Sequence, residues 1–268
     1  VKLDDLARNC ARAQQIPTEQ NAFRRLHCGE WTAQTTRWIP LDTWDANNDG
    51  PIDEDSLAGR PGYGGLDLSA VRDLTAWVMV FPREDDPEAV DILCRFWCPE
   101  AWAHSAENRY ADQYQAWARD GWLTLTEGAA VDYDFVRAAI LADATKFRIV
   151  DFNVDRLFQA HETAAKLASE GMTVFGMGQG FLSMAAPMKE FERRLIGRKL
   201  HHGGNPILRF MAEGAAVSQD PAGNLKFNKA HSQSKIDGLV ALVMSLDRVM
   251  RRETVTISRY EERGLLVF

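Results

Sequence analysis

Long apolar runs and cysteines are the features that this sequence has least of. It contains no run of about 18 apolar residues, so it predicts no membrane-spanning helix. Its four cysteines include Cys94 and Cys98, which lie close together in an apolar run that is typical of a strand. On a strand their spacing is about 13 Å, too far for both thiolates to hold one zinc ion. We therefore expect buried, reduced thiols rather than a metal site.

Basic residues are fewer than acidic ones, which gives a formal net charge of −7 at pH 7. A protein that binds DNA on its own is usually basic, since neutralising phosphates drives its affinity. The acidity counts against tight autonomous DNA binding and suits a site that gathers carboxylates around cations. The sequence also lacks a GxxxxGKS/T loop, and its Gly-rich run at 176–181 has no lysine to reach nucleotide phosphates. We therefore expect that this chain neither hydrolyses ATP nor translocates DNA by itself.

The composition nevertheless supports a large folded unit. Of the 268 residues, 46% are hydrophobic and 10% aromatic, which is enough for one large domain with an arm. Residues 1–45 are predicted to be that arm, because an amphipathic helix over 3–15 ends before Pro17. The sequence starts at Val1 rather than at methionine and has no signal peptide, which indicates a piece of a longer protein. Residues 46–268 are predicted to form the folded domain.

Strand and helix signals alternate along the predicted domain. Three strands are expected over 64–69, 74–81 and 89–98, and their short polar connections predict a meander. The elements expected after them are strands at 122–128, 147–155 and 172–181, helices at 107–121, 134–144, 156–171, 187–200, 207–214 and 234–252, and a hairpin over 215–230. This order predicts an α/β fold with a mixed central sheet flanked by helices.

Three acidic residues fall where strands and a helix could bring them together. Asp67 lies within the first strand on its polar face, Asp155 ends the strand at 147–155, and Asp237 lies in the first turn of the last helix. Carboxylates suit hard ions such as Mg²⁺ or Mn²⁺, and two such ions can support phosphodiester hydrolysis. Structural roles fit the same residues, because Asp155 and Asp237 could cap helices and Asp67 could face solvent. The spacing alone leaves both interpretations open.

Several long runs of this sequence resemble one known family. These are YGGLDLSAVRDLTAW at 63–77, the run from WCPEAW to YDFV at 97–136, and the run from MGQGFLS through HHGGNP and KIDG to VMSL at 177–246. The resemblance extends from about Phe23 to the end of the chain, and the family is the nuclease domain of tailed-phage terminase large subunits. It implies a fold similar to RNase H and the retroviral integrases, with an antiparallel three-strand meander plus parallel strands. It also implies an endonuclease that cuts concatemeric double-stranded DNA with two divalent cations, Mg²⁺ or Mn²⁺.

The resemblance assigns roles to particular acids. Asp67 matches the family's first-strand acid, Asp237 matches the acid of the last helix, and Asp73 matches a recurrent acid that we interpret as a secondary metal ligand. The middle acid is less clear, because the family's strand ends in an aromatic-Asp pair where this sequence has VDRLF. We favour Asp155, since a helix is expected directly after it. Asp151 is its rival, on the same strand face but about 13 Å away.

Basic residues that could hold DNA lie just before the acid of the last helix. They are Lys226, Lys229, His231 and Lys235. The family further implies an ATPase domain missing from this chain, the portal protein and the small terminase subunit as partners, at the procapsid portal in the host cytoplasm. Two other functions stay open from the sequence: a related transposase or resolvase, and a non-catalytic module that docks on the portal or on DNA.

Overall fold

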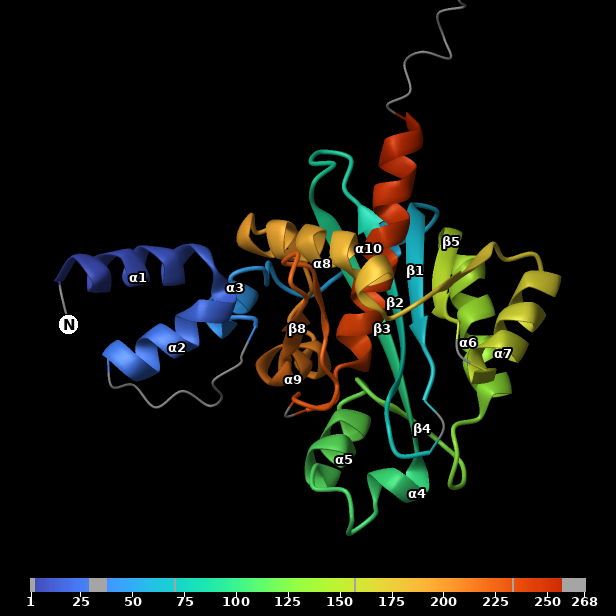
Figure 1. Cartoon of the computed structure of the whole chain (residues 1–268). Coiled ribbons are helices and arrows are strands. Elements are labelled where there is room, and N and C mark those ends of the chain that lie inside the picture. The colour runs from blue at the N-terminus through green and yellow to red at the C-terminus, as the bar shows by residue number, and fades with distance from the viewer. Residues whose placement is uncertain (1–2, 29–37, 70, 157, 233, 257–268) are drawn as a thin grey trace, which may run out of the picture.

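The computed structural model describes residues 3–28, 38–69, 71–156, 158–232 and 234–256, which build a central sheet with helices on both faces (Figure 1). The sheet order is β4-β3-β2-β1-β5-β6, and β7 pairs with β3. The strands are β1 Pro61–Asp67, β2 Thr75–Pro82, β3 Val90–Pro99, β4 Thr124–Thr126, β5 Arg148–Asp155, β6 Val174–Met177 and β7 Leu200–His201. The first three strands are antiparallel neighbours, whereas β5 runs parallel to β1 and β6 parallel to β5. The predicted mixed sheet is therefore confirmed.

Helices cover the two faces of the sheet separately. The helices are α1 Leu3–Gln15, α2 Pro17–His27, α3 Leu41–Asp45, α4 Glu100–Ala103, α5 Ala111–Arg119, α6 Tyr133–Lys146, α7 Phe158–Ser169, α8 Phe181–Ile196, α9 Pro206–Gly214 and α10 Asp237–Thr256. One buried cluster joins α8, α9 and α10 to the sheet, and a second joins α6 and α7 to its other face. The predicted hairpin is formed by β8 Val217–Gln219 and β9 Leu225–Phe227. No helix in the described part of the chain is long and apolar enough to cross a membrane.

The central helix α10 packs directly against the middle of the sheet. It contacts β1, β2 and β5, and its residues from Leu239 to Leu246 are almost completely buried. Gly65 in β1 makes this close approach possible, because an added Cβ there would lie 2.0 Å from the carbonyl oxygen of Ala241. Ser245 ties the helix to the sheet by donating a hydrogen bond of 2.9 Å to the carbonyl of Val78. Gly65 thus allows α10 to cross β1 at close range.

The predicted arm is only partly separate from the core. Helices α1 and α2 project away from the sheet (Figure 1). Trp38 and Trp44, which also fall within residues 1–45, are buried in the main core. The Trp38 ring lies 5.1 Å from Phe191 and 5.5 Å from Phe227. Residues 38–45 therefore contribute aromatic packing to the folded unit.

For two elements the predicted first residue is wrong. We expected the helix after the Gly-rich turn to begin at Pro187, but α8 begins at Phe181 and Pro187 lies buried inside it. A proline removes one helical N–H, and here the helix continues past it. The first strand runs over Pro61–Asp67 rather than 64–69. Its early residues are Pro, Gly and Tyr, which give no hydrophobic alternation from which the strand could be recognised.

The HHGGNP turn contributes to the core through a buried histidine. His202 stacks on Trp44 with ring centroids 4.5 Å apart, and its Nε2–H donates to the Trp44 carbonyl at 2.9 Å. Its Nδ1 accepts a hydrogen bond from the amide of Gly204 at 3.2 Å. Burial lowers the pKa of His202, and this outweighs the hydrogen bond to the Trp44 carbonyl and the smaller attraction of Asp45, which both raise it. A proton on Nδ1 would also remove the acceptor for Gly204.

This histidine should make the fold sensitive to mild acid. Because the folded pKa of His202 lies below its unfolded value of about 6.5, stability is full above that pH and is lost as pH falls toward the folded pKa. Replacing His202 by Gln keeps a donor for the Trp44 carbonyl and removes the titration. The drop in Tm between pH 7.5 and 5.5, followed by circular dichroism, should therefore be smaller in His202→Gln than in the wild type. Equal drops would show that folding does not lower the pKa of His202.

Candidate metal centre

Three of the predicted acids meet at one edge of the sheet. Asp67 is the last residue of β1 rather than a mid-strand residue, and Asp155 is the last residue of β5. Because β1 and β5 are parallel neighbours with Leu66 opposite Val154, their carboxyl ends place Asp67 beside Asp155. Asp237 is the first residue of α10, which packs on β1. The sheet and the central helix therefore bring together carboxylates that lie far apart in the sequence.

A lysine and a glutamine connect these carboxylates. Lys229 donates from Nζ to Asp67 Oδ2 at 3.2 Å and to Asp237 Oδ1 at 3.3 Å. Gln179 donates from Nε2 to Asp155 Oδ2 at 2.8 Å and to Asp67 Oδ1 at 3.3 Å. The ammonium group therefore lies between two acids, and the amide group holds the ends of β1 and β5 in register.

Burial and mutual repulsion make the charged state of two acids costly. Asp67 and Asp237 are each only 4% exposed. Burial raises the pKa of Asp67 most, with smaller contributions from Asp155 and Asp73, although Lys229 opposes the change. Burial also raises the pKa of Asp237, and repulsion from Asp73 and Asp67 adds to it. The site is therefore short of positive charge, even with Lys229 in place.

The donor set fits a divalent metal ion. Asp237 Oδ2 is buried and has no hydrogen-bond partner among the described residues. A bound cation would satisfy that oxygen, and carboxylate oxygens are the ligands that Mg²⁺ and Mn²⁺ prefer. In the part of the chain that the structure describes, no three His, Cys, Asp or Glu side chains form a ready-made set of ligands for one ion. The ammonium group of Lys229 holds Asp67 and Asp237 in their present arrangement, so metal binding requires that group to move.

The two remaining acidic candidates lie in different places. Asp73 pairs with Lys235 at 2.8 Å and is close enough to repel Asp237. Asp151 forms two hydrogen bonds of 2.9 Å with the guanidinium group of Arg248 on α10. Asp67, Asp155 and Asp237 together form what we call the carboxylate cluster. Asp73 borders this cluster, whereas Asp151 belongs to an ion pair farther back along β5.

The four predicted DNA-binding residues also separate. Lys229 contacts Asp67 and Asp237, and Lys235 contacts Asp73 at the border of the cluster. Lys226 lies with its Nζ 4.8 Å from the centre of the Phe181 ring at the start of α8. His231 is exposed on the surface. Only the two lysines nearest Asp237 in the sequence therefore touch the acids.

Gln179 is the contact that sequence reasoning missed. It stands between two glycines in GMGQGF and is the second residue after β6 ends at Met177. Because β6 is parallel to β5 and Met177 lies opposite Asp155, the segment that follows β6 reaches the same edge of the sheet as Asp155. A polar side chain between glycines after a parallel strand is the signal that could have identified it.

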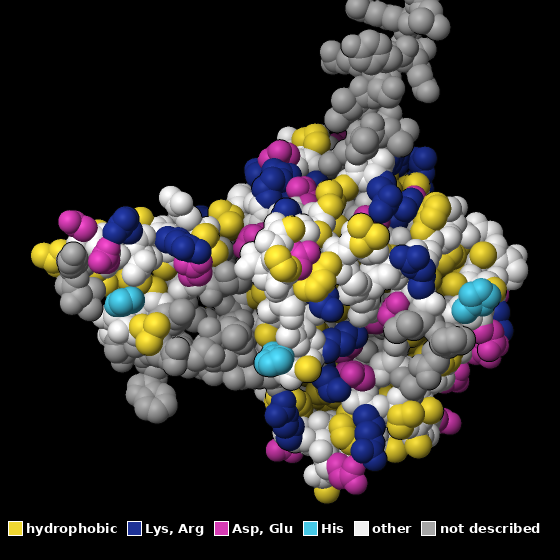
Figure 2. Space-filling model, in the orientation of Figure 1, with side chains coloured by type: hydrophobic (Ala, Val, Ile, Leu, Met, Phe, Trp, Pro, Cys, Tyr) yellow, Lys and Arg dark blue, Asp and Glu magenta, His cyan; other side chains and the backbone are white. Residues whose placement is uncertain are grey.

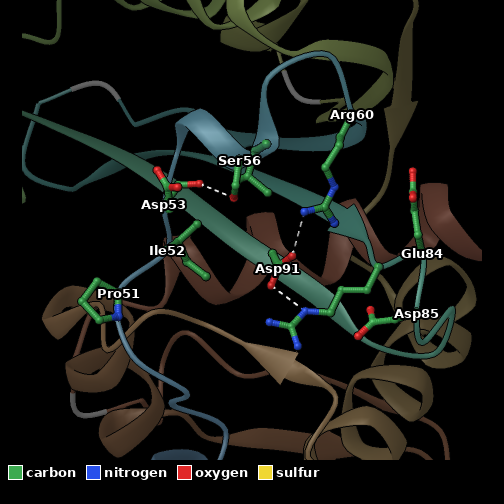
Figure 3. Close-up of a pocket in the computed structure, with 10 residues that line it drawn as sticks. Pro51, Ile52, Asp53, Ser56, Arg60, Glu84, Asp85 and Asp91 are labelled. Carbon is green, nitrogen blue, oxygen red and sulfur yellow. Dashed lines mark hydrogen bonds and ion pairs between the residues drawn. The ribbon is translucent and has the colours of Figure 1, made fainter.

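A separate cavity, which is not lined by Asp67, Asp155 or Asp237, lies near the start of β1 and β3 (Figure 3). It has a volume of about 580 Å³. Arg60 and Arg83 line it, and both bind the buried carboxylate of Asp91, at 3.1 and 2.9 Å. Asp53, Glu84 and Asp85 also lie around it. Asp91 therefore pairs with both guanidinium groups of this cavity.

Sequence comparisons point to one family. The sequence-family model for the terminase large subunit, endonuclease domain, matches residues 1–253 of this chain. The chain is 32% identical over 243 residues to the terminase large subunit of Enterobacteria phage HK97, covering 90% of this chain and 47% of that protein. It is 30% identical over 251 residues to protein YmfN of Escherichia coli K12, covering 90% and 55%. The chain thus spans about half the length of the curated relatives that it matches.

Structural comparisons agree with the sequence comparisons. The crystal structure of the HK97 large terminase matches with a TM-score of 0.70 at 31% identity, over 92% of this chain and 51% of that chain. The large terminase nuclease of thermophilic phage G20c matches with a TM-score of 0.52 at 9% identity, over 78% and 97%. The second match shows the fold alone, and it confirms the predicted RNase H-like architecture. The chain therefore belongs to the endonuclease-domain family of terminase large subunits.

Proposed function

We propose that this domain is a metal-dependent endonuclease that hydrolyses phosphodiester bonds of double-stranded DNA. The observation that carries the proposal is the meeting of Asp67, Asp155 and Asp237, with an unpartnered buried oxygen on Asp237. The G20c nuclease has been solved with bound magnesium and with bound cobalt, which supports a divalent ion here as well. We assign two Mg²⁺ or Mn²⁺ ions to these three acids, with Asp73 as a secondary ligand.

The residues around the acids have distinct parts in this mechanism. Asp67, Asp155 and Asp237 would hold the two divalent ions, which would supply activation of the attacking water and stabilisation of the leaving oxygen. Gln179 orients Asp67 and Asp155 by donating to both. Lys229 and Lys235 provide positive charge beside the acids, which suits a DNA phosphate. Asp151 is engaged by Arg248, which favours Asp155 as the middle acid.

The role of the whole protein follows from the same assignment. We infer that the longer polypeptide cuts concatemeric viral DNA during genome packaging, at the procapsid portal in the host cytoplasm. An ATPase domain of that polypeptide, the portal protein and the small terminase subunit are its proposed partners. In this assignment residues 1–45 connect the nuclease to the ATPase domain, and Lys226 and His231 extend the DNA contact beyond Lys229 and Lys235.

Nicking of a closed circular plasmid tests the proposed activity. With millimolar Mn²⁺ or Mg²⁺ the domain should convert supercoiled plasmid to open-circular and then linear DNA, and excess EDTA should stop both conversions. The net charge of −7 favours weak binding, so cleavage should fall steeply as salt rises. DNA or portal binding without cleavage at any divalent ion would instead indicate a non-catalytic docking module.

A further inference from the structure

A cavity of about 290 Å³ opens directly beside the carboxylate cluster, between the α4–α5 segment and the side chains of Lys229 and Lys235. These two lysines line it, and their ammonium groups reach Asp67, Asp237 and Asp73. Figure 2 shows Lys and Arg side chains spread over the part of the surface in front of α5. Only the side chains of these two lysines therefore separate a ligand in the cavity from the proposed metal ligands that they contact.

One wall of the cavity is aromatic and rigid. Trp102, Tyr110 and Tyr114 line it. The Tyr110 ring packs edge-to-face on Phe210, with centroids 4.9 Å apart. Tyr114 is buried, with its ring 5.6 Å from Trp117. Because neighbouring rings support this wall from behind, it is formed before any ligand arrives.

Three cationic side chains also line the cavity, those of Arg109, Lys229 and Lys235. The guanidinium group of Arg109 lies 4.6 Å from the centre of the Tyr110 ring. Arg72 does not line the cavity, and its guanidinium group lies 5.6 Å from the centre of the Trp102 ring. Among the described residues that line the cavity, Glu107 is the sole carboxylate, and it pairs with Arg72 at 3.3 Å. The cavity thus combines aromatic rings with Arg109 and two lysines, and the ammonium groups of these lysines pair with Asp67, Asp237 and Asp73.

We propose that this cavity binds one unpaired nucleotide of the DNA, with its base against the aromatic wall and its phosphate toward the lysines. The inference rests on the proposed nuclease function. Aromatic rings stack with any base, and cations beside them hold the phosphate. A phosphate alone would leave the aromatic wall unused, and a cavity of this volume does not admit a duplex. The DNA therefore opens by at least one base pair beside the cut, as in enzymes that extrude a base.

Binding of two matched DNAs in EDTA tests this nucleotide site. One is a blunt duplex, and the other has the same sequence with a short single-stranded extension. Wild-type protein should bind the extended DNA about tenfold more tightly, a typical effect of stacking one base. The double variant Trp102→Leu/Tyr110→Leu should lose this preference and keep its affinity for the blunt duplex. A 2-aminopurine at the first unpaired position should be quenched by the wild type and stay bright with the double variant.

Two further variants serve as controls for this experiment. Trp122→Leu removes a tryptophan that is 41% exposed and does not line the cavity, so it should behave like the wild type. Trp102→Leu alone serves if the double variant melts early, and it should lose most of the preference. Equal wild-type affinity for both DNAs, or a preference that survives Trp102→Leu, overturns the proposal. Plasmid nicking without any preference rejects the nucleotide site alone, whereas a preference without nicking rejects the nuclease function alone.

Discussion

Replacing Asp237 by Asn should abolish DNA cleavage and, in the same protein, raise the melting temperature of the metal-free domain. The first effect follows because Asn removes the charge that holds a divalent ion, and we expect a loss of at least about a thousandfold. The second follows from the site itself. The carboxylate of Asp237 is buried, one of its oxygens has no partner among the described residues, and Asp73 and Asp67 repel it.

The Asn amide group reverses part of that repulsion, because its N–H groups can donate to Asp73. We expect the metal-free Tm to rise by about 2–4 °C, the size of about 1 kcal/mol in a domain of this length. Millimolar Mn²⁺ should raise the Tm of the wild type, since an ion bound only by the folded state stabilises it by mass action. That rise should disappear in Asp237→Asn. Thermal melting with Mn²⁺ and with EDTA measures both effects on one sample.

Other variants separate the metal ligands from their neighbours. Asp67→Asn and Asp155→Asn should also lose cleavage while they stay folded. Asp151→Asn is the matched control on the same strand. It breaks the half-buried pair with Arg248 and should lower Tm, yet it should still cut plasmid. Cleavage at the wild-type rate in Asp67→Asn would reject the site, and its loss in a folded Asp151→Asn would exchange the roles of Asp151 and Asp155.

The positions of two of the acids at the ends of elements could be predicted from sequence because local signals mark those ends, whereas their roles came from the family resemblance. Asp155 and Asp237 stand at a strand end and at a helix start, and those boundaries are visible in the apolar pattern. Asp67 was placed on the correct strand but within it rather than at its end. The strand starts at Pro61, and a Gly-rich start carries no periodic signal.

Contacts made by distant parts of the chain could not be predicted in the same way. The ammonium group of Lys229 touches Asp67, 162 residues away, and Gln179 touches the same acid from 112 residues away. Both contacts depend on strand order and on the crossing of α10. The burial of Trp38 and Trp44 could not be predicted either. Their partners Phe191 and His202 lie in elements that the local sequence pattern does not connect to them.

Replacing Lys229 by Met should tighten metal binding and slow DNA cleavage at the same time. In the metal-free domain the ammonium group lies between Asp67 and Asp237, 3.2 and 3.3 Å from their oxygens. Although burial opposes it, attraction to these two acids raises the pKa of Lys229 above its usual value, so the group stays charged. A divalent ion must therefore displace one positive charge to bind the same oxygens. Met retains the length of the side chain and removes that competitor.

Opposite changes in metal affinity and cleavage distinguish this role from a purely structural one. In Lys229→Met, Mn²⁺ titrated by calorimetry should bind about tenfold more tightly, about 1.4 kcal/mol. The metal-free Tm should fall, because Asp67 and Asp237 then repel each other without a neutralising group, and the rise on adding Mn²⁺ should grow. Cleavage at subsaturating DNA should nevertheless slow, and the slope of log rate against log salt should flatten by about one, because one phosphate contact is lost.

Lys235→Met is the matched control for Lys229→Met. Its ammonium group pairs with Asp73 rather than with Asp67 or Asp237, so its removal should change metal affinity much less and still flatten the salt slope. Weaker Mn²⁺ binding in Lys229→Met than in the wild type would mean that the lysine organises the acids rather than competing for them. Unchanged metal affinity with unchanged cleavage would mean that DNA approaches the acids from a side that Lys229 does not face.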